Sequence, residues 1–155
     1  MTVAHASHPS ASAPHSRSFA PGLLAVPGRV LMSIIFLLSG FGKIANFSYM
    51  AGYMASKGAP APKVLLALAA AAELAGGLSL LLGLWSRVGA LGLFVFLIPT
   101  TLMFHNFWAA AAGLEQMNQQ AHFLKNVAIM GGLLMVAAYG PGPLSVDHAR
   151  RHASR

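Results

Sequence analysis

The chain has 155 residues, of which 56% are hydrophobic and only 8% are charged, and its formal net charge is +7. Because soluble domains usually carry about 25% charged residues, this composition excludes an ordinary soluble monomer. The lack of cysteine excludes thiolate and disulfide chemistry, and cysteine-ligated iron–sulfur or zinc centres, on this chain.

Residues 1–26 are rich in Ala, Ser, His and Pro and are predicted to form a disordered tail, because they have too little apolar content to pack. The segment also lacks the basic region followed by an apolar core that marks a secretory signal. Pro21 and Pro27 should interrupt the chain, so the first helix is expected to begin near Gly28 or Arg29.

Four apolar runs follow at residues 30–47, 64–84, 88–107 and 123–139, and each approaches the roughly 20 residues that cross a bilayer. They predict an all-α fold, an integral membrane four-helix bundle over residues 27–143. No run shows the alternation expected of a β-barrel strand. The link at residues 84–87 is so short that the second and third helices should form an antiparallel hairpin.

The segments between these helices are predicted to be loops. Residues 48–62 contain two glycines and two prolines and are expected to hold at most a short interfacial turn around residues 49–54. The polar segment 109–121 is expected to be a loop, and Pro99 is expected to kink the third helix. Residues 144–155 are predicted to form a short basic tail.

The basic residues separate by type across the predicted membrane. Every arginine should lie on the side of the two termini and every lysine on the other side: Arg17, Arg29, Arg87, Arg150, Arg151 and Arg155 against Lys43, Lys57, Lys63 and Lys125. The positive-inside rule favours the arginine side as cytoplasmic, which predicts an N-in, C-in topology. Because these bases flank apolar runs, we interpret them as topology determinants and lipid anchors, and we predict no nucleic-acid partner.

Glu73 lies near the middle of the apolar run 64–84. A carboxylate at that depth costs about 2.5 kcal/mol or more unless it is paired, protonated or in contact with a wet cavity, so intramembrane acids often mark functional sites. Small residues on the same helical face, such as Gly76 and Gly77, should let a neighbouring helix approach closely. A structural ion pair with a lysine from another helix is the competing interpretation.

Further polar residues should lie outward of Glu73, at the helix ends: Lys43, His105, Asn106, Lys125 and Asn126. Glu73 would lie roughly 15 Å below the outer end of its helix, so these groups would form a funnel that narrows to one acid. Such a funnel suits a small polar headgroup or proton movement. The simpler interpretation is that the lysines snorkel to the interface and that Trp108 belongs to an aromatic belt. The scattered histidines predict no metal site and no haem site.

Several short blocks occur along residues 28–147, namely Gly28-Arg29, Ser39-Gly40-Phe41-Gly42-Lys43, Glu73-Leu74-Ala75-Gly76-Gly77, Leu82-Gly83-Leu84-Trp85-Ser86-Arg87, His105-Asn106-Phe107-Trp108, Phe123-Leu124-Lys125-Asn126 and Gly131-Gly132-Leu133. In this order they resemble the DoxX family of small four-helix membrane proteins. The resemblance implies a bacterial inner-membrane protein linked to respiratory or redox complexes, some of them quinone-coupled.

The resemblance and the polar residues together suggest a subunit of a quinone-linked oxidoreductase complex. Glu73, Lys43 and His105 would handle protons or the headgroup, and a bound quinone would be held by Lys125, Asn126, Asn106 and Trp108. The chain has no evident redox centre of its own, so redox partner proteins would supply electrons. A non-enzymatic membrane scaffold and a small proton-coupled carrier are the alternatives, and the sequence leaves homo-oligomerisation open.

Overall fold

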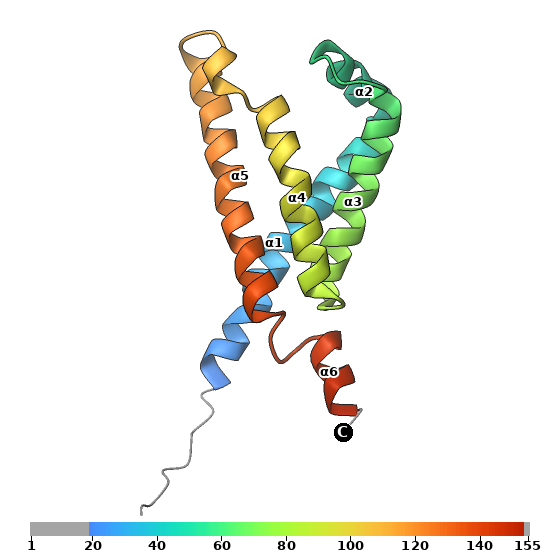
Figure 1. The fold of residues 1–155 in the computed structure, drawn as a ribbon, viewed down its shortest axis with the longest axis vertical. Coiled ribbons are helices and arrows are strands. Elements are labelled where there is room, and N and C mark those ends of the chain that lie inside the picture. Colours follow the sequence, from blue (N-terminus) through green and yellow to red (C-terminus); the bar gives the residue numbers. More distant parts are fainter. Residues whose placement is uncertain (1–18, 154–155) are drawn as a thin grey trace, which may run out of the picture.

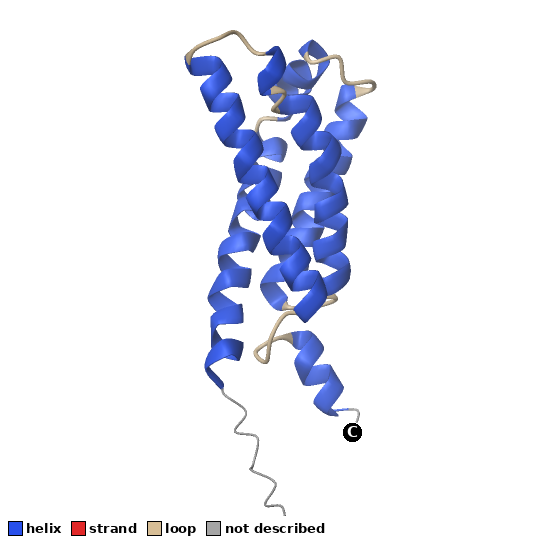
Figure 2. Ribbon diagram, turned by 60° about the vertical axis from the view of Figure 1, so that its left-hand side comes forward, coloured by secondary structure: helices blue, strands red, loops and turns tan. Residues whose placement is uncertain are grey.

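The structure, a computed structural model, describes residues 19–153 as an elongated bundle of helices (Figure 1). In chain order the elements are α1 (Phe19–Ala45), α2 (Phe47–Ser56), α3 (Pro62–Leu82), α4 (Ser86–Phe104), the 3-10 helix η1 (Phe107–Ala109), α5 (Leu114–Tyr139) and α6 (Val146–Ala153). No strand occurs between residues 19 and 153 (Figure 2).

Four helical segments are long and apolar enough to cross a membrane, at residues 22–45, 62–82, 86–109 and 114–139. The predicted all-α fold with four membrane-spanning helices is therefore confirmed. The short hairpin between α3 and α4 is confirmed as well. It turns within three residues, two of which, Gly83 and Trp85, adopt left-handed backbone conformations with φ values of 67° and 49°. 

The predicted start of the first helix is wrong, because α1 begins at Phe19 and runs through Pro27. Pro21 lies in the first turn, where a missing backbone N–H removes no helical hydrogen bond. Pro27 removes one bond from the interior, but the apolar run continues on both sides of it. The tail predicted over residues 1–26 is therefore helical from residue 19, and residues 1–18 lie outside the described residues.

Helices extend into both predicted loops and into the C-terminal tail. Residues 114–121 belong to α5, because Leu, Glu, Gln, Met and Ala are good helix formers and polarity alone does not end a helix. The turn expected around residues 49–54 is the longer helix α2, and the predicted C-terminal tail contains α6. α4 continues as a helix through Pro99.

Small residues allow the closest helix contacts. A Cβ added at Gly40 of α1 would lie 2.8 Å from Cγ of Leu74, and one added at Gly77 of α3 would lie 2.9 Å from Cδ2 of Leu37. A Cβ at Gly76 would lie 2.5 Å from Cγ of Leu93 on α4. Because glycine has no side chain, these positions let α1 and α4 pack directly against α3.

The bundle is packed in one half and splayed in the other. A core cluster fills the half that carries α6: Phe36, Leu80, Ala90, Leu93, Leu97 and Leu133. Toward the other end, α4 and α5 diverge from α2 and α3 (Figure 1). We call the end with α6 the inner end and the end with α2 and η1 the outer end, after the predicted topology.

Long-range hydrogen bonds tie α6 and the loop before it to the inner end. The buried guanidinium of Arg29 donates to the backbone oxygens of Pro141 and Leu144, at 2.7 and 2.8 Å. The Asp147 carboxylate accepts from the backbone N–H groups of Trp85 and Ser86, at 2.8 and 3.1 Å. Asp147 thus caps the N-terminus of α4 from a distant segment, in place of a local capping residue.

Replacing Asp147 with alanine should remove this cap and lower the melting temperature of the detergent-solubilised protein by a few degrees, since a lost N-cap costs about 1 kcal/mol. Glu115→Ala, which removes an exposed acid in the first turn of α5, is the matched control and should leave the melting temperature unchanged. Equal melting temperatures for the two variants would show that the cap adds no stability.

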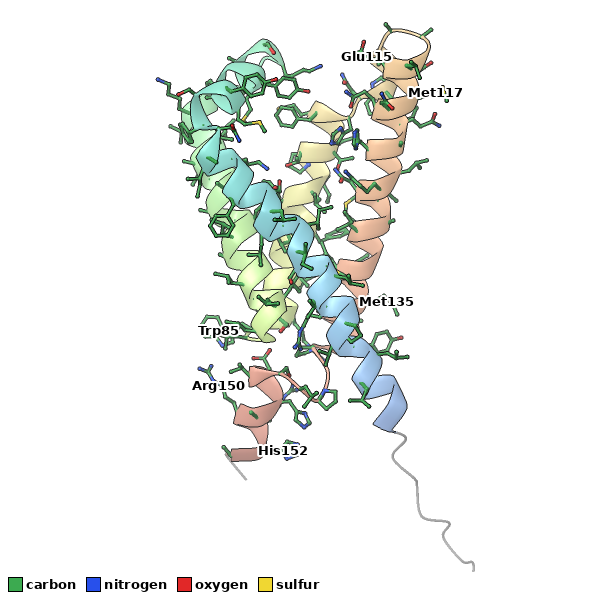
Figure 3. The ribbon with its side chains drawn as sticks, turned by 180° about the vertical axis from the view of Figure 1, so that it is seen from behind. Trp85, Glu115, Met117, Met135, Arg150 and His152 are labelled. Carbon is green, nitrogen blue, oxygen red and sulfur yellow. The ribbon has the colours of Figure 1, made fainter. Side chains whose placement is uncertain are left out.

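Arg29 bonds the loop before α6 at the inner end and Lys63 lies at the outer end of α3, whereas Lys43 lies beside Glu73, which is within α3. Trp85 and Arg150 lie at the inner end and Glu115 at the outer end (Figure 3). The N-in, C-in orientation stays a prediction, and a fluorescent protein fused to the C-terminus should fluoresce, because it folds in the cytoplasm. A C-terminal alkaline phosphatase fusion with high activity would contradict it.

Candidate functional site

The Glu73 carboxylate forms an ion pair with Lys43 inside the bundle. The ammonium Nζ of Lys43 lies 2.7 Å from Oε2 and 2.9 Å from Oε1 of Glu73. Ser39 accepts a hydrogen bond from Lys43 at 2.7 Å and lies 3.1 Å from Oε1 of Glu73, to which its hydroxyl donates. The three side chains form a closed polar triangle, in which the Glu73 side chain is only 6% exposed.

The close approach of α1 and α3 positions this triangle. Gly40 lies between Ser39 and Lys43 and packs against Ala70 and Leu74 of α3, so α1 crosses α3 at the level of Glu73. Ser39 and Lys43 are four residues apart and therefore share a face. The expectation that the Lys43 ammonium lies outward of Glu73 is wrong, because α1 ends beside the middle of α3 and the lysine turns inward.

A cavity of about 610 Å³ opens beside the ion pair, between α1 and α3 on one side and α4 and α5 on the other, with α2 above. Its walls are mostly apolar. Apart from Tyr53 on α2, the polar side chains that line it fall into two groups: Ser39, Lys43 and Glu73 on the α1–α3 wall, and Thr100, His105, Lys125 and Asn126 on the α4–α5 wall. A cavity of this size matches those that bind small organic ligands in proteins.

The α4–α5 wall is organised by its own hydrogen bonds. Nδ1 of His105 lies 3.0 Å from Oε1 of Gln119, and Nζ of Lys125 lies 3.1 Å from Nδ1 of His122. The two imidazole rings are 5.2 Å apart between centroids. A third hydrogen bond, from Asn126 Nδ2 to Thr101 Oγ1 at 3.0 Å, joins α5 to α4.

The structure brings together five of the seven residues predicted for the site: Lys43, Glu73, His105, Lys125 and Asn126 all line the cavity. Asn106 and Trp108 do not line it. Trp108 packs edge-on against Phe107 and Phe123, with ring centroids 5.2 and 5.9 Å away, in an aromatic cluster at the outer end. That arrangement fits an interfacial belt better than a ring-stacking site.

Sequence reasoning missed three residues of the site. Ser39 is a direct partner of the ion pair, and its spacing from Lys43 was the available signal. Gln119 lies on the part of α5 predicted as a loop and His122 lies between that loop and the fourth apolar run, so neither was assigned to a helical face. Among residues 19–153, no group of three His, Cys, Asp or Glu side chains is arranged to hold a metal ion.

Comparisons with known proteins agree with this architecture. Residues 24–106 match the family model described as DoxX. The chain is 37% identical over 119 residues to "Inner membrane protein YqjF" of Escherichia coli strain K12, covering 77% of this chain and 85% of that protein. It is 33% identical over 130 residues to "Inner membrane protein YphA" of the same strain, covering 82% and 89%. No solved structure matches the chain.

We expect the two charges of the ion pair to stabilise the folded protein only when both are present. Glu73→Gln or Lys43→Met alone leaves one charge without its counter-ion in an apolar helix and should lower the melting temperature in detergent. The double variant Lys43→Met/Glu73→Gln should recover most of that loss, with a coupling free energy of about 2 kcal/mol. Additive single effects would show that the charges do not stabilise one another.

Proposed function

Since the chain belongs to the DoxX family and is a multi-pass inner membrane protein, we propose that it serves as a subunit of a membrane redox complex. In this proposal the outer cavity binds the headgroup of a quinone. The observation that carries the proposal is the cavity itself, which is apolar over most of its walls and has hydrogen-bond donors on two facing walls.

These donors fit the chemistry of a quinone ring, which is flat and apolar and has carbonyl oxygens on opposite edges. Lys43 on the α1–α3 wall and Lys125 on the α4–α5 wall each offer an ammonium, whereas His105 already contacts the side-chain oxygen of Gln119 through Nδ1. Two donors on facing walls can bind both oxygens while the apolar residues between them contact the ring. Asn106 and Trp108 are not part of the proposed site, because neither lines the cavity.

The ion pair provides a route for protons. Reduction of a quinone to a quinol adds two electrons and two protons, one proton to each ring oxygen. In this proposal Lys43 donates one proton to one ring oxygen and Lys125 donates the other to the opposite oxygen, and both lysines are reprotonated from water, Lys43 by way of Glu73 and Ser39, with which it is hydrogen-bonded. The two electrons would come from a reduced redox partner protein.

The ion pair is also what a non-enzymatic scaffold would need, because a buried pair can hold two helices in register without touching any ligand. The two functions differ in what they require of the charges. A scaffold needs a folded bundle, which the doubly neutral variant should retain, whereas quinone binding needs the donor itself.

Protein purified in a mild detergent should bind a decyl-tailed benzoquinone, and Lys43→Met/Glu73→Gln should weaken that binding about tenfold or more, since a hydrogen bond from a charged donor is worth about 1.5–3 kcal/mol. Lys63→Met, which removes an exposed lysine outside the cavity, is the control and should bind like the wild type. Wild-type protein that neither binds the quinone nor co-purifies with a redox protein would overturn the proposal.

A further inference from the structure

The outer halves of α3 and α4 leave an opening that leads from the cavity to the side of the bundle. Four cavity-lining residues are exposed there, Leu68 and Ala72 on α3 and Pro99 and Met103 on α4. Leu68 is 61% exposed and Met103 is 37% exposed, although both border the same cavity as the ion pair. We call this opening, defined by these four residues, the α3–α4 window.

The α3–α4 window is bounded at both ends. Toward the inner end, Leu93 of α4 packs against Gly76 so closely that a Cβ there would lie 2.5 Å from it. Toward the outer end, the ring of Phe104 stacks on Tyr53 of α2, with centroids 6.0 Å apart. The window therefore faces the hydrocarbon region and does not extend along the whole helix pair.

Mostly apolar side chains of α2 line the outer side of this part of the cavity, and we call them the roof. α2 contributes Met50, Tyr53 and Met54 to the cavity lining, and Phe104 lies beside them. Met54 is buried in a cluster with Ala51, Ala59 and Leu66, against which Met50 and Phe104 pack. These apolar side chains favour an apolar ligand over a polar solute on the outer side, and a molecule in the bilayer meets the exposed residues of the window.

From this geometry we infer that the ligand is a membrane-dissolved, long-tailed molecule that enters and leaves sideways through the α3–α4 window. Its headgroup lies over Lys43 and Glu73, and its tail lies across Leu68, Ala72 and Met103 toward the lipid. The inference rests on the proposed function and narrows the ligand class to tailed quinones of the isoprenoid type, as opposed to small soluble quinones.

The chemistry of the window supports an apolar tail. The window residues are Leu, Ala, Pro and Met, which have no side-chain hydrogen-bonding group other than the weak acceptor sulfur of Met103. Beside it, the hydroxyl of Thr100 donates to the backbone oxygen of Phe96 at 2.9 Å, so that donor is already used within α4. An alkyl tail loses no hydrogen bond there and gains apolar contacts, whereas a charged group would be desolvated without a partner.

Adjacent residues on α3 offer a matched test. Ala71 and Ala72 are both exposed, but only Ala72 lines the cavity. Ala72→Trp should fill the window and weaken binding of the decyl-tailed benzoquinone by about tenfold, whereas Ala71→Trp should leave it within about twofold of the wild type. On α4, Met103→Trp and its neighbour Leu102→Trp form a second pair with the same expectation, since only Met103 lines the cavity.

A tail-less benzoquinone with the same ring separates this inference from the proposed function. In the wild type it should bind at least about tenfold more weakly than the tailed form, and Ala72→Trp should affect it less. Equal binding of the tailed and tail-less forms, unaffected by tryptophan at either window position, would overturn the lateral route and leave the proposed function intact. Failure of the wild type to bind either form would overturn both.

Cysteine labelling gives a second measurement that needs only a small substitution in a chain without cysteine. In a mild detergent at pH 8.5, where water reaches the bundle surface and part of each thiol is ionised, Ala72→Cys and Ala71→Cys should both react with a small maleimide. The decyl-tailed quinone should slow the reaction at position 72 and not at position 71. Equal rates with and without quinone at position 72 would contradict a tail lying in the window.

Discussion

The contact between Lys43 and Glu73 is the interaction on which the outer half of this molecule depends. A carboxylate in the middle of a membrane-spanning helix is costly unless a counter-charge meets it, and the lysine that does so comes from the end of a different helix. That lysine reaches Glu73 because α1 and α3 approach closely. The backbone at Gly40 of α1 contacts a side chain of α3, and the backbone at Gly77 of α3 contacts a side chain of α1. The ion pair therefore depends on the two glycines as well as on the two charged side chains.

This arrangement divides the bundle into two halves with different properties. In the inner half, a leucine-rich core, the Arg29 hydrogen bonds and the Asp147 cap fix the helices to one another and to α6. In the outer half, α3 and α4 separate, and the space between them is a cavity with few polar side chains. The inner half is therefore closely packed, and the outer half leaves room for a ligand.

Local sequence patterns were sufficient for the fold because hydropathy alone marks spans of about 20 residues in a membrane protein. They also singled out Glu73 and raised an ion pair with a lysine from another helix, since such charges are rare in apolar runs. Local patterns failed where the role of a residue depends on contacts with a distant segment. Asp147 looked like part of a basic tail, and only the fold places it at the start of α4. The roof formed by α2 and the role of Ser39 likewise depend on which helices meet, which spacing along one segment does not reveal.

The most direct test of the central claim, that the outer cavity holds a tailed quinone from the membrane, is native mass spectrometry of the protein released from its own membrane. The predicted result is a bound species whose extra mass equals that of an isoprenoid quinone, present in the wild type and absent from the doubly neutral Lys43→Met/Glu73→Gln variant. A folded wild-type protein that carries only phospholipid would contradict the claim.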